Sequence, residues 1–336
     1  MKILHLTPHM GGGIGTVVMD WMDKAIAAND HYHRIVCLDY ANDKAKKWAE
    51  KKGFPLAENM GRYPLLWKHE ISEVDIVLTH FWDHPMLADL FADSIPDCRM
   101  VCWCHKNITA TMFNPVWWDR VLNYPDRFIN TSPIQGCGCE HIWSTGNMDR
   151  FLAIEPKPHQ GFNVGTVASK KLHPEFMGMC LAIKQSIPDA RFTILGESSL
   201  VTPYEKIFTF TGKVDDVVPY LAEMDVFGYP LRSDHYGTAE QALGECMSAG
   251  VVPIVMNNPS EALIVRDGEN GKVASTEQEY IEAVQYIYGN PAKRKMLSNM
   301  ARTDAKRLYS IDEMVRQWDS VFNSLMEQPK KRKIPL

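Results

Sequence analysis

Two glutamates between His235 and Val255 are the residues whose type and spacing most clearly suggest chemistry. Glu240 is expected in the first turn of a helix over 239–249, where unpaired N–H groups and the helix dipole favour an anion. Glu245 follows about a turn and a half later among small and apolar residues, and a carboxylate in such surroundings needs a polar partner. That partner is either a pair of sugar hydroxyls or an internal N–H group or lysine.

The elements that position these glutamates are typical of the ligand-binding edge of a parallel sheet. A short loop, Tyr236-Gly237-Thr238, leads into the helix, and Gly250 ends it. The apolar, β-branched run 251–255 then predicts a buried parallel strand. The loop and the helix N-terminus are therefore expected to bind phosphate.

This stretch resembles an element of the retaining glycosyltransferases of family four (glycosyl transferases group 1), which have the GT-B fold. The run Glu245-Cys246-Met247-Ser248-Ala249-Gly250, followed by 252–255, is similar to the family's Glu-Ala-Met helix and Pro-Val-Val strand, and Tyr236-Gly237 is similar to its aromatic-Gly pair. The spacing from that glycine to the second glutamate is longer here. The family's first glutamate is absent from its usual place, and Asp234 or Glu240 is expected to replace it.

A glycine-rich loop also follows the first predicted strand, 2–7. Residues 11–16, Gly-Gly-Gly-Ile-Gly-Thr, precede a helix predicted over 17–28, and glycines let a ligand approach the backbone closely. In the resembled family this loop faces the cleft between the domains, which implies that Gly13 and Gly15 lie against the donor or the acceptor. A dinucleotide site with Gly11, Gly13 and Asp39 is the alternative.

Two further predicted strands, 74–78 and 100–104, each deliver a histidine to the same edge of the sheet. His80 and His105 follow these strands, and ligands bind where parallel strands end. The resemblance implies that His105 lies at the transferred sugar. The expected acceptor contacts are His80, Trp82, Asp83 and Lys106.

The second half of the chain begins with a new strand, 162–167, followed by Lys170 and Lys171 ahead of a helix over 175–186. Lysines supply point charges to a diphosphate. The family has an arginine near Thr166 and a lysine near this pair, and it binds the base around the loop matching Gly212. The expected donor site comprises Gly13, Gly15, Lys170, Lys171, Gly212, Lys213, Arg232, Tyr236, Gly237, Thr238, Ala239, Glu240 and Glu245, and the expected catalytic residues are His105, Glu245 and Asp234.

Composition limits the remaining possibilities. With 336 residues, 45% of them hydrophobic, the chain fits two domains, and a net charge of -5 gives no general case for nucleic-acid binding. No apolar run is long enough for a transmembrane helix, and no signal peptide is expected before the first strand. We expect a cytoplasmic protein with free thiols. The basic tail 330–333 is expected to be solvated or weakly attached to an anionic membrane surface.

These observations predict an α/β protein with two Rossmann-like domains, 1–157 and 158–312, and a C-terminal helix and tail, 313–336, returning to the first. The resemblance implies transfer of a sugar from a nucleotide-diphosphate-sugar, most readily a UDP-sugar, to a hydroxyl of a glycan, lipid-linked or other acceptor. It implies retention at the anomeric carbon and no metal ion or other cofactor. Two alternatives stay open: an NAD-dependent oxidoreductase and a non-catalytic sugar- or partner-binding protein on this scaffold.

Overall fold

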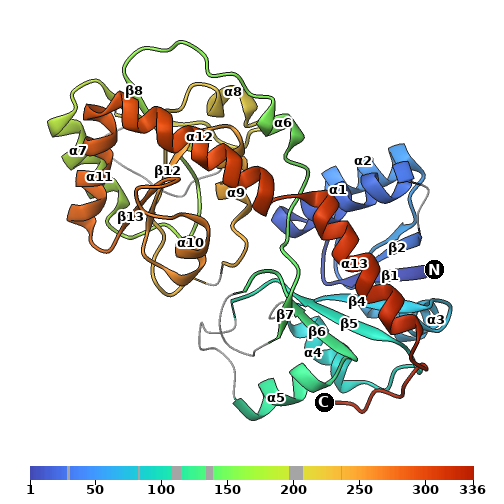
Figure 1. Ribbon diagram of the computed structural model, residues 1–336. Helices are drawn as coiled ribbons and strands as arrows, with labels where there is room; N and C mark the ends of the chain where they lie inside the picture. The colour runs from blue at the N-terminus through green and yellow to red at the C-terminus, as the bar shows by residue number, and fades with distance from the viewer. Residues whose placement is uncertain (29–30, 82–83, 108–114, 134–138, 197–206, 236) are drawn as a thin grey trace. The chain divides into compact units, whose positions relative to one another are not determined.

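The computed structural model describes residues 1–28, 31–81, 84–107, 115–133, 139–196, 207–235 and 237–336, with the backbone alone over 115–118. These residues form two compact units, each built on one parallel sheet (Figure 1). The first unit comprises Met1–Asn147, Tyr236–Ala239 and Ile311–Leu336, and the second comprises Met148–His235 and Glu240–Ser310.

The first unit contains a seven-stranded sheet in the order β3-β2-β1-β4-β5-β6-β7. Every strand pairs with its neighbours in parallel, as in a doubly wound α/β fold. The elements are β1 (Lys2–Thr7), α1 (Gly12–Ala28), β2 (Tyr32–Cys37), α2 (Asp43–Lys52), β3 (Leu56–Ala57), a 3-10 turn (Met60–Arg62), α3 (Pro64–Ser72), β4 (Ile76–Phe81), α4 (Pro85–Ala92), β5 (Met100–Cys104), α5 (Pro115–Asn123), β6 (Arg127–Asn130), β7 (Glu140–His141) and α13 (Ile311–Met326).

The second unit contains a six-stranded parallel sheet in the order β10-β9-β8-β11-β12-β13. In both sheets the strand order reverses beside the first strand of the unit, at β1/β4 and at β8/β11, where open α/β sheets bind ligands. The elements are α6 (Asp149–Leu152), β8 (Phe162–Val167), α7 (Phe176–Ser186), β9 (Ala190–Leu195), β10 (Phe208–Phe210), α8 (Val218–Leu221), β11 (Val226–Tyr229), α9 (Gln241–Ser248), β12 (Val252–Met256), α10 (Pro259–Ile264), β13 (Lys272–Ala274), α11 (Glu277–Gly289) and α12 (Pro291–Leu308).

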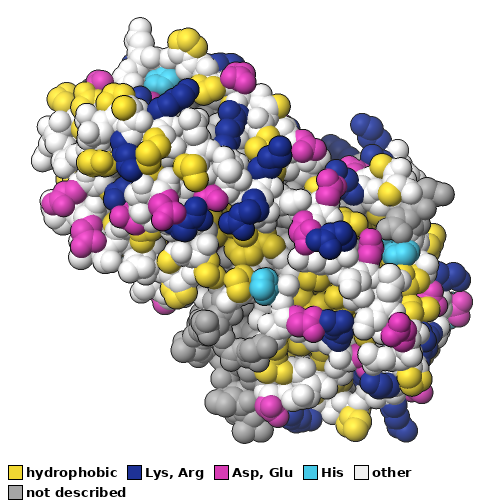
Figure 2. All heavy atoms as spheres, in the orientation of Figure 1, with side chains coloured by type: hydrophobic (Ala, Val, Ile, Leu, Met, Phe, Trp, Pro, Cys, Tyr) yellow, Lys and Arg dark blue, Asp and Glu magenta, His cyan; other side chains and the backbone are white. Residues whose placement is uncertain are grey.

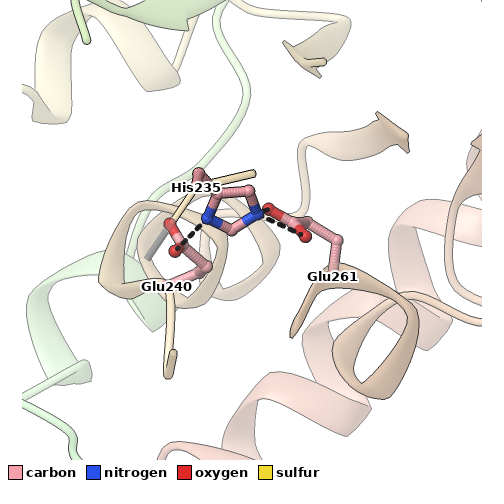
Figure 3. Close-up of side chains that lie close together, drawn as sticks. All are labelled: His235, Glu240 and Glu261. Carbon is pink, nitrogen blue, oxygen red and sulfur yellow. Dashed lines mark hydrogen bonds and ion pairs between the residues drawn. The ribbon is translucent and has the colours of Figure 1, made fainter. Parts of the chain in front are cut away.

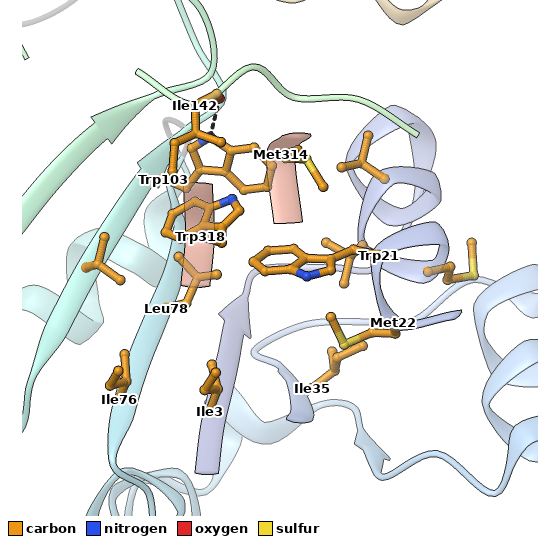
Figure 4. Close-up of a cluster of buried hydrophobic side chains, with 14 of the residues drawn as sticks. Ile3, Trp21, Met22, Ile35, Ile76, Leu78, Trp103, Ile142, Met314 and Trp318 are labelled. Atoms are coloured by element: carbon orange, nitrogen blue, oxygen red, sulfur yellow. Dashed lines mark hydrogen bonds between the residues drawn. The ribbon is translucent and has the colours of Figure 1, made fainter. Parts of the chain in front are cut away.

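One face of the first sheet is covered by α1 and α13 through a cluster of tryptophans (Figure 4). Trp21 of α1 stacks on Trp318 of α13 with ring centroids 5.4 Å apart, and Trp103 of β5 meets Trp318 edge-on at 5.1 Å. The apolar residues of α13 recur every three or four positions, which gives the helix one continuous apolar stripe. The last helix of the chain therefore completes the core of the first unit.

Two element boundaries of the first unit differ from the sequence-based expectation, and both affect the site. Helix α1 begins at Gly12 rather than near residue 17, so Gly13 and Gly15 lie in its first turn and not in a loop. A methyl group on Gly15 would lie 3.1 Å from the carbonyl carbon of Met10, so the glycine permits this close packing. Strand β4 runs on to Phe81, because Thr79, His80 and Phe81 stay in register with β5.

The C-terminal tail is bound to the first unit, and of the basic cluster expected to be solvated only Lys333 is buried. Cys98 and Lys331 exchange two backbone hydrogen bonds of 3.1 Å. The Lys333 ammonium lies 2.6 Å from an Asp126 carboxylate oxygen, and both side chains are 4% exposed. Lys331 also lies 3.4 Å from Asp126. Two of the four basic side chains are therefore paired with a carboxylate of the protein itself.

We expect Lys333→Met to destabilise the first unit by about 1–3 kcal/mol at neutral pH, because a buried charged hydrogen bond is lost. Burial alone would raise the pKa of Asp126, but Lys333, the Met100 N–H and Lys331 outweigh it and lower the pKa below 3.8. A depressed carboxyl pKa stabilises the fold above the unfolded pKa and loses this effect as the pH falls through the folded value. The difference between wild type and variant should therefore shrink as the pH falls below 3.8.

Urea unfolding followed by tryptophan fluorescence measures this effect, because all nine tryptophans lie in the first unit. Lys330→Met removes the same charge from an exposed position and serves as the control. Equal unfolding free energies for the two variants across the pH range would contradict the buried pair.

The visible surface carries both signs of charge. In Figure 2, Lys and Arg side chains are interspersed with Asp and Glu side chains over the face shown. This distribution agrees with the modest net charge of -5 and gives this face no basic stripe for a nucleic-acid backbone. Among the residues that the structure describes, no helix combines the length and the apolar character needed to cross a bilayer.

Candidate active site

A buried cluster of acidic and basic side chains lies at the point of the second sheet where the strand order reverses. Glu240, which precedes α9, accepts hydrogen bonds from the Lys171 ammonium at 2.9 Å to each carboxylate oxygen and from the Tyr229 hydroxyl at 2.8 Å. The Glu240 side chain is 3% exposed. Burial and the Glu240 carboxylate raise the pKa of Tyr229, which keeps this phenol a donor.

The sequence predicts Glu240 in the first turn of the helix. In the structure it occupies the cap position before that turn. Its backbone is left-handed, with φ 37°, and its side chain makes no capping hydrogen bond. This conformation is strained for a residue with a Cβ, and surrounding contacts must hold it in place. The Tyr309 hydroxyl, which donates to the Glu240 carbonyl at 3.2 Å, joins Lys171 and Tyr229 in doing so.

His235 extends this cluster to a second carboxylate (Figure 3). Its Nε2 lies 3.1 Å and 3.0 Å from the two carboxylate oxygens of Glu261 in α10, and its Nδ1 lies 4.0 Å from Glu240. The three side chains offer ligand atoms within 4.8 Å of one another, a spacing that suits a metal ion. The Lys171 ammonium already donates to both oxygens of Glu240. A positive charge of the protein itself therefore lies beside this cluster.

The side of α9 that carries Glu245 is only partly covered. Leu243, Cys246 and Met247 are fully buried, whereas Gln241, Ala242 and Glu245 keep part of their surface. Residues three and four apart lie on one face of a helix, so these three form a common face near the helix N-terminus. Glu245 therefore keeps part of its surface on this face of the helix.

The two lysines predicted for the diphosphate have different surroundings. Lys171 is paired with Glu240, whereas Lys170 is exposed. The structure thus leaves Lys170 as the more accessible cation after β8. Arg232 pairs with Asp234 at the surface, which compensates the charge of both predicted residues. Gly212 has a left-handed backbone with φ 65°, and Lys213 beside it is exposed.

In the first unit, the predicted residues gather where β1, β4, β5 and β6 end. Lys106, Asn107 and Thr131 surround a cavity of about 10 Å³, which is room for a water molecule rather than a sugar. Thr238, from the segment that groups with this unit, accepts a 2.9 Å hydrogen bond from Thr131. Gly237 and Ala239 beside it are buried.

The two predicted histidines of this edge have different positions. His105 is partly exposed after β5, and burial lowers its pKa. His80 is fully buried inside β4 and uses both ring nitrogens for hydrogen bonds to other histidines. His80 therefore has no ring nitrogen left for the acceptor contact predicted for it. Trp82, Asp83 and Tyr236 lie outside the described residues.

Sequence reasoning missed three residues that shape these sites. His5 and His33 lie inside strands. His5 contacts His80 directly, and His33 contacts His5. The available signal was that His5 and His33 share one face of their strands with Ile3 and Ile35, two positions away. Tyr229, at the end of β11, has no sequence signal beyond its place at the end of an apolar run.

Comparison with known proteins supports the predicted family resemblance and the predicted fold. Residues 161–290, which span β8 to α11, match the family of glycosyl transferases group 1. The solved structure of Anabaena HepE in complex with UDP is 14% identical, with a TM-score of 0.75, and the match covers 96% of this chain and 100% of HepE.

Two further solved structures give similar values. A glycosyltransferase from Rickettsia africae has a TM-score of 0.75 at 13% identity, covering 97% of this chain and 99% of its own. The sucrose-phosphate synthase of Thermosynechococcus elongatus has a TM-score of 0.72 at 13% identity, covering 97% and 100%. The fold is GT-B.

The GT-B fold and the resemblance to group 1 glycosyl transferases are thus confirmed. The matched range lies over the second unit, the half of the GT-B fold that carries Lys170, Glu240 and Glu245. A search among curated proteins finds no match.

Proposed function

We propose that this protein transfers a sugar from a nucleotide-diphosphate-sugar to a hydroxyl group of a glycan, lipid-linked or other acceptor. The observation that carries the proposal is the match of residues 161–290 to glycosyl transferases group 1. HepE, which has a similar fold, has been solved with UDP and with UDP-glucose. A UDP-sugar is therefore the first donor to test.

In the proposed complex, the second unit binds the donor. The partly exposed Glu245 accepts the ribose hydroxyls, and the N-terminus of α9 and the exposed Lys170 hold the diphosphate. Lys171 contributes by fixing Glu240 at the cap of that helix rather than by binding phosphate directly. His105 of the first unit contacts the transferred sugar.

The proposed reaction retains the anomeric configuration. The acceptor hydroxyl approaches on the side of the leaving group, and a phosphate oxygen takes its proton. Donors already in place at the diphosphate stabilise the charge that builds on it, which is the role of the α9 N–H groups and Lys170. We propose that this stabilisation works without a metal ion. No disulfide joins the seven cysteines that the structure describes to one another, which fits a reducing compartment such as the cytoplasm.

A thermal-shift panel of UDP-, GDP- and ADP-sugars, with NADH as the comparison, tests the donor class. We expect a UDP-sugar to raise the melting temperature and to be turned over in the presence of EDTA, with the anomeric configuration followed by NMR.

Lys170→Ala should weaken UDP binding about tenfold in calorimetry, the effect of one charged hydrogen bond. Lys295→Ala, an exposed lysine on α12, is the matched control. In the thermal-shift panel, stabilisation by NADH and by none of the nucleotide-sugars would overturn the proposal.

A further inference from the structure

Four histidines, three in the neighbouring strands β2, β1 and β4 and one directly after β5, form one hydrogen-bonded row through the first sheet. His33 Nδ1 lies 3.0 Å from His5 Nε2, His5 Nδ1 lies 3.0 Å from His80 Nε2, and His80 Nδ1 lies 3.1 Å from His105 Nε2. His5 and His80 are completely buried, and His33 is 5% exposed. The row thus links the His105 side chain to the interior of the unit.

The register of the sheet produces this row. His33 of β2 lies opposite Ile3, two residues before His5 of β1, and His5 lies opposite Leu78, two residues before His80 of β4. His80 lies opposite Trp103, two residues before His105. A step of two residues keeps side chains on one face, so the four rings cross the sheet diagonally on that face.

Aromatic side chains enclose the row. The Trp21 ring meets His5 edge-on at 5.1 Å, and the Trp103 ring lies 5.8 Å from His80 and 4.6 Å from His105. Burial is the main reason that the pKa values of His5, His80 and His105 are lowered. These rings are therefore neutral, and a neutral imidazole has one N–H donor and one acceptor nitrogen.

Every link of the row joins Nδ1 of one ring to Nε2 of the next. If His33 donates from Nδ1, then His5, His80 and His105 must each accept at Nε2 and carry their own proton on Nδ1. If His105 donates from Nε2, all four rings must carry their proton on Nε2. Mixed arrangements leave at least one buried link with two donors or two acceptors, which costs free energy.

We propose that His33, His5 and His80 are positioning residues that fix the ring orientation and the tautomer of His105, with all four rings in the same tautomer. The role of His105 at the transferred sugar rests on the proposed function, but the shared tautomer does not. In one state His105 Nδ1 is a donor and in the other it is an acceptor, so the row decides which hydrogen bond His105 can make.

Nitrogen-15 NMR of the full chain with labelled histidine tests the row directly, because the shifts of Nδ1 and Nε2 distinguish the two tautomers. We expect His5, His33, His80 and His105 to show one common tautomer in the wild type. His5→Phe keeps an aromatic ring but cuts the row, and His105 should then populate both tautomers. Trp21→Phe, which changes the packing on His5 without removing a link, should leave the tautomers unchanged. Different tautomers among the four wild-type rings would overturn the proposal.

A milder pair of variants at the end of the row tests its effect on transfer. His33→Phe removes the first link, whereas His33→Asn keeps a side-chain amide near the position of Nδ1. By analogy with groups that orient functional histidines, we expect His33→Phe to lower kcat about tenfold with KM for the donor nearly unchanged. His33→Asn should keep kcat near the wild-type value. Equal kcat in all three proteins would refute the positioning role. Absence of transfer in the wild type would instead refute the proposed function and leave the NMR result standing.

Discussion

Glu240→Ala is expected to lower the free energy of unfolding of the second unit by about 3 kcal/mol, because breaking a buried ion pair leaves the other charge uncompensated. The variant removes the only carboxylate that Lys171 contacts among the described pairs, and it removes the acceptor of the Tyr229 hydroxyl. The backbone strain at φ 37° would remain, since alanine also has a Cβ.

Two companion variants separate these contributions. Glu240→Gly loses the same hydrogen bonds but relieves the left-handed strain, so it should be more stable than Glu240→Ala by about 1 kcal/mol. Adding Lys171→Met to Glu240→Ala removes the uncompensated cation and should recover part of the loss, as a double-mutant cycle would show.

Far-UV circular dichroism in urea follows both units, whereas tryptophan fluorescence follows the first unit alone, because the second contains none of the nine tryptophans. A transition seen by circular dichroism and not by fluorescence therefore reports the second unit. Glu269→Ala, which breaks an exposed pair with Arg266 in the same unit, is the control and should cost well under about 1 kcal/mol. If Glu240→Ala were no more destabilised than this control, the buried cluster would not support the unit.

Glu245→Ala is expected to weaken UDP binding about a hundredfold without a comparable loss of stability. Two charged hydrogen bonds to a ribose diol contribute about 3 kcal/mol, and this corresponds to a factor of about a hundred in the dissociation constant. Glu245 lies on the partly covered face of α9, so its removal opens no cavity in the core. Transfer at low donor concentration should fall by a similar factor.

The contact with the ribose is tested by comparing UDP with its 2′-deoxy analogue in calorimetry. Wild type should bind the deoxy analogue more weakly than UDP, and Glu245→Ala should bind both alike, because the partner of the missing hydroxyl is gone. Glu282→Ala removes an exposed carboxylate of α11 and should behave as wild type. Wild-type discrimination retained in Glu245→Ala would assign the ribose to another residue.

Local patterns predicted the framework well. The strands 2–7 and 162–167 have the boundaries expected from the residue pattern. The glycine run 11–16 was less informative, since it favours a loop by propensity, whereas packing of Gly15 on Met10 allows a helix from Gly12.

What the sequence determined by itself was the set of strand ends and helix starts that carry polar residues, and hence the fold class and the position of Glu245, His105 and the lysine pair. These follow from periodicity and turn residues, which act over a few neighbouring positions.

Only the tertiary structure decided which of these groups pair with one another. Lys171 and Glu240 are 69 residues apart, and His5 and His80 are 75 residues apart, yet each pair is in hydrogen-bond contact. The registers of β1 with β4 and of β8 with β11, together with the loops that follow, bring them together. A buried polar group must find a partner, and which partner it finds depends on strand order, which no local pattern encodes.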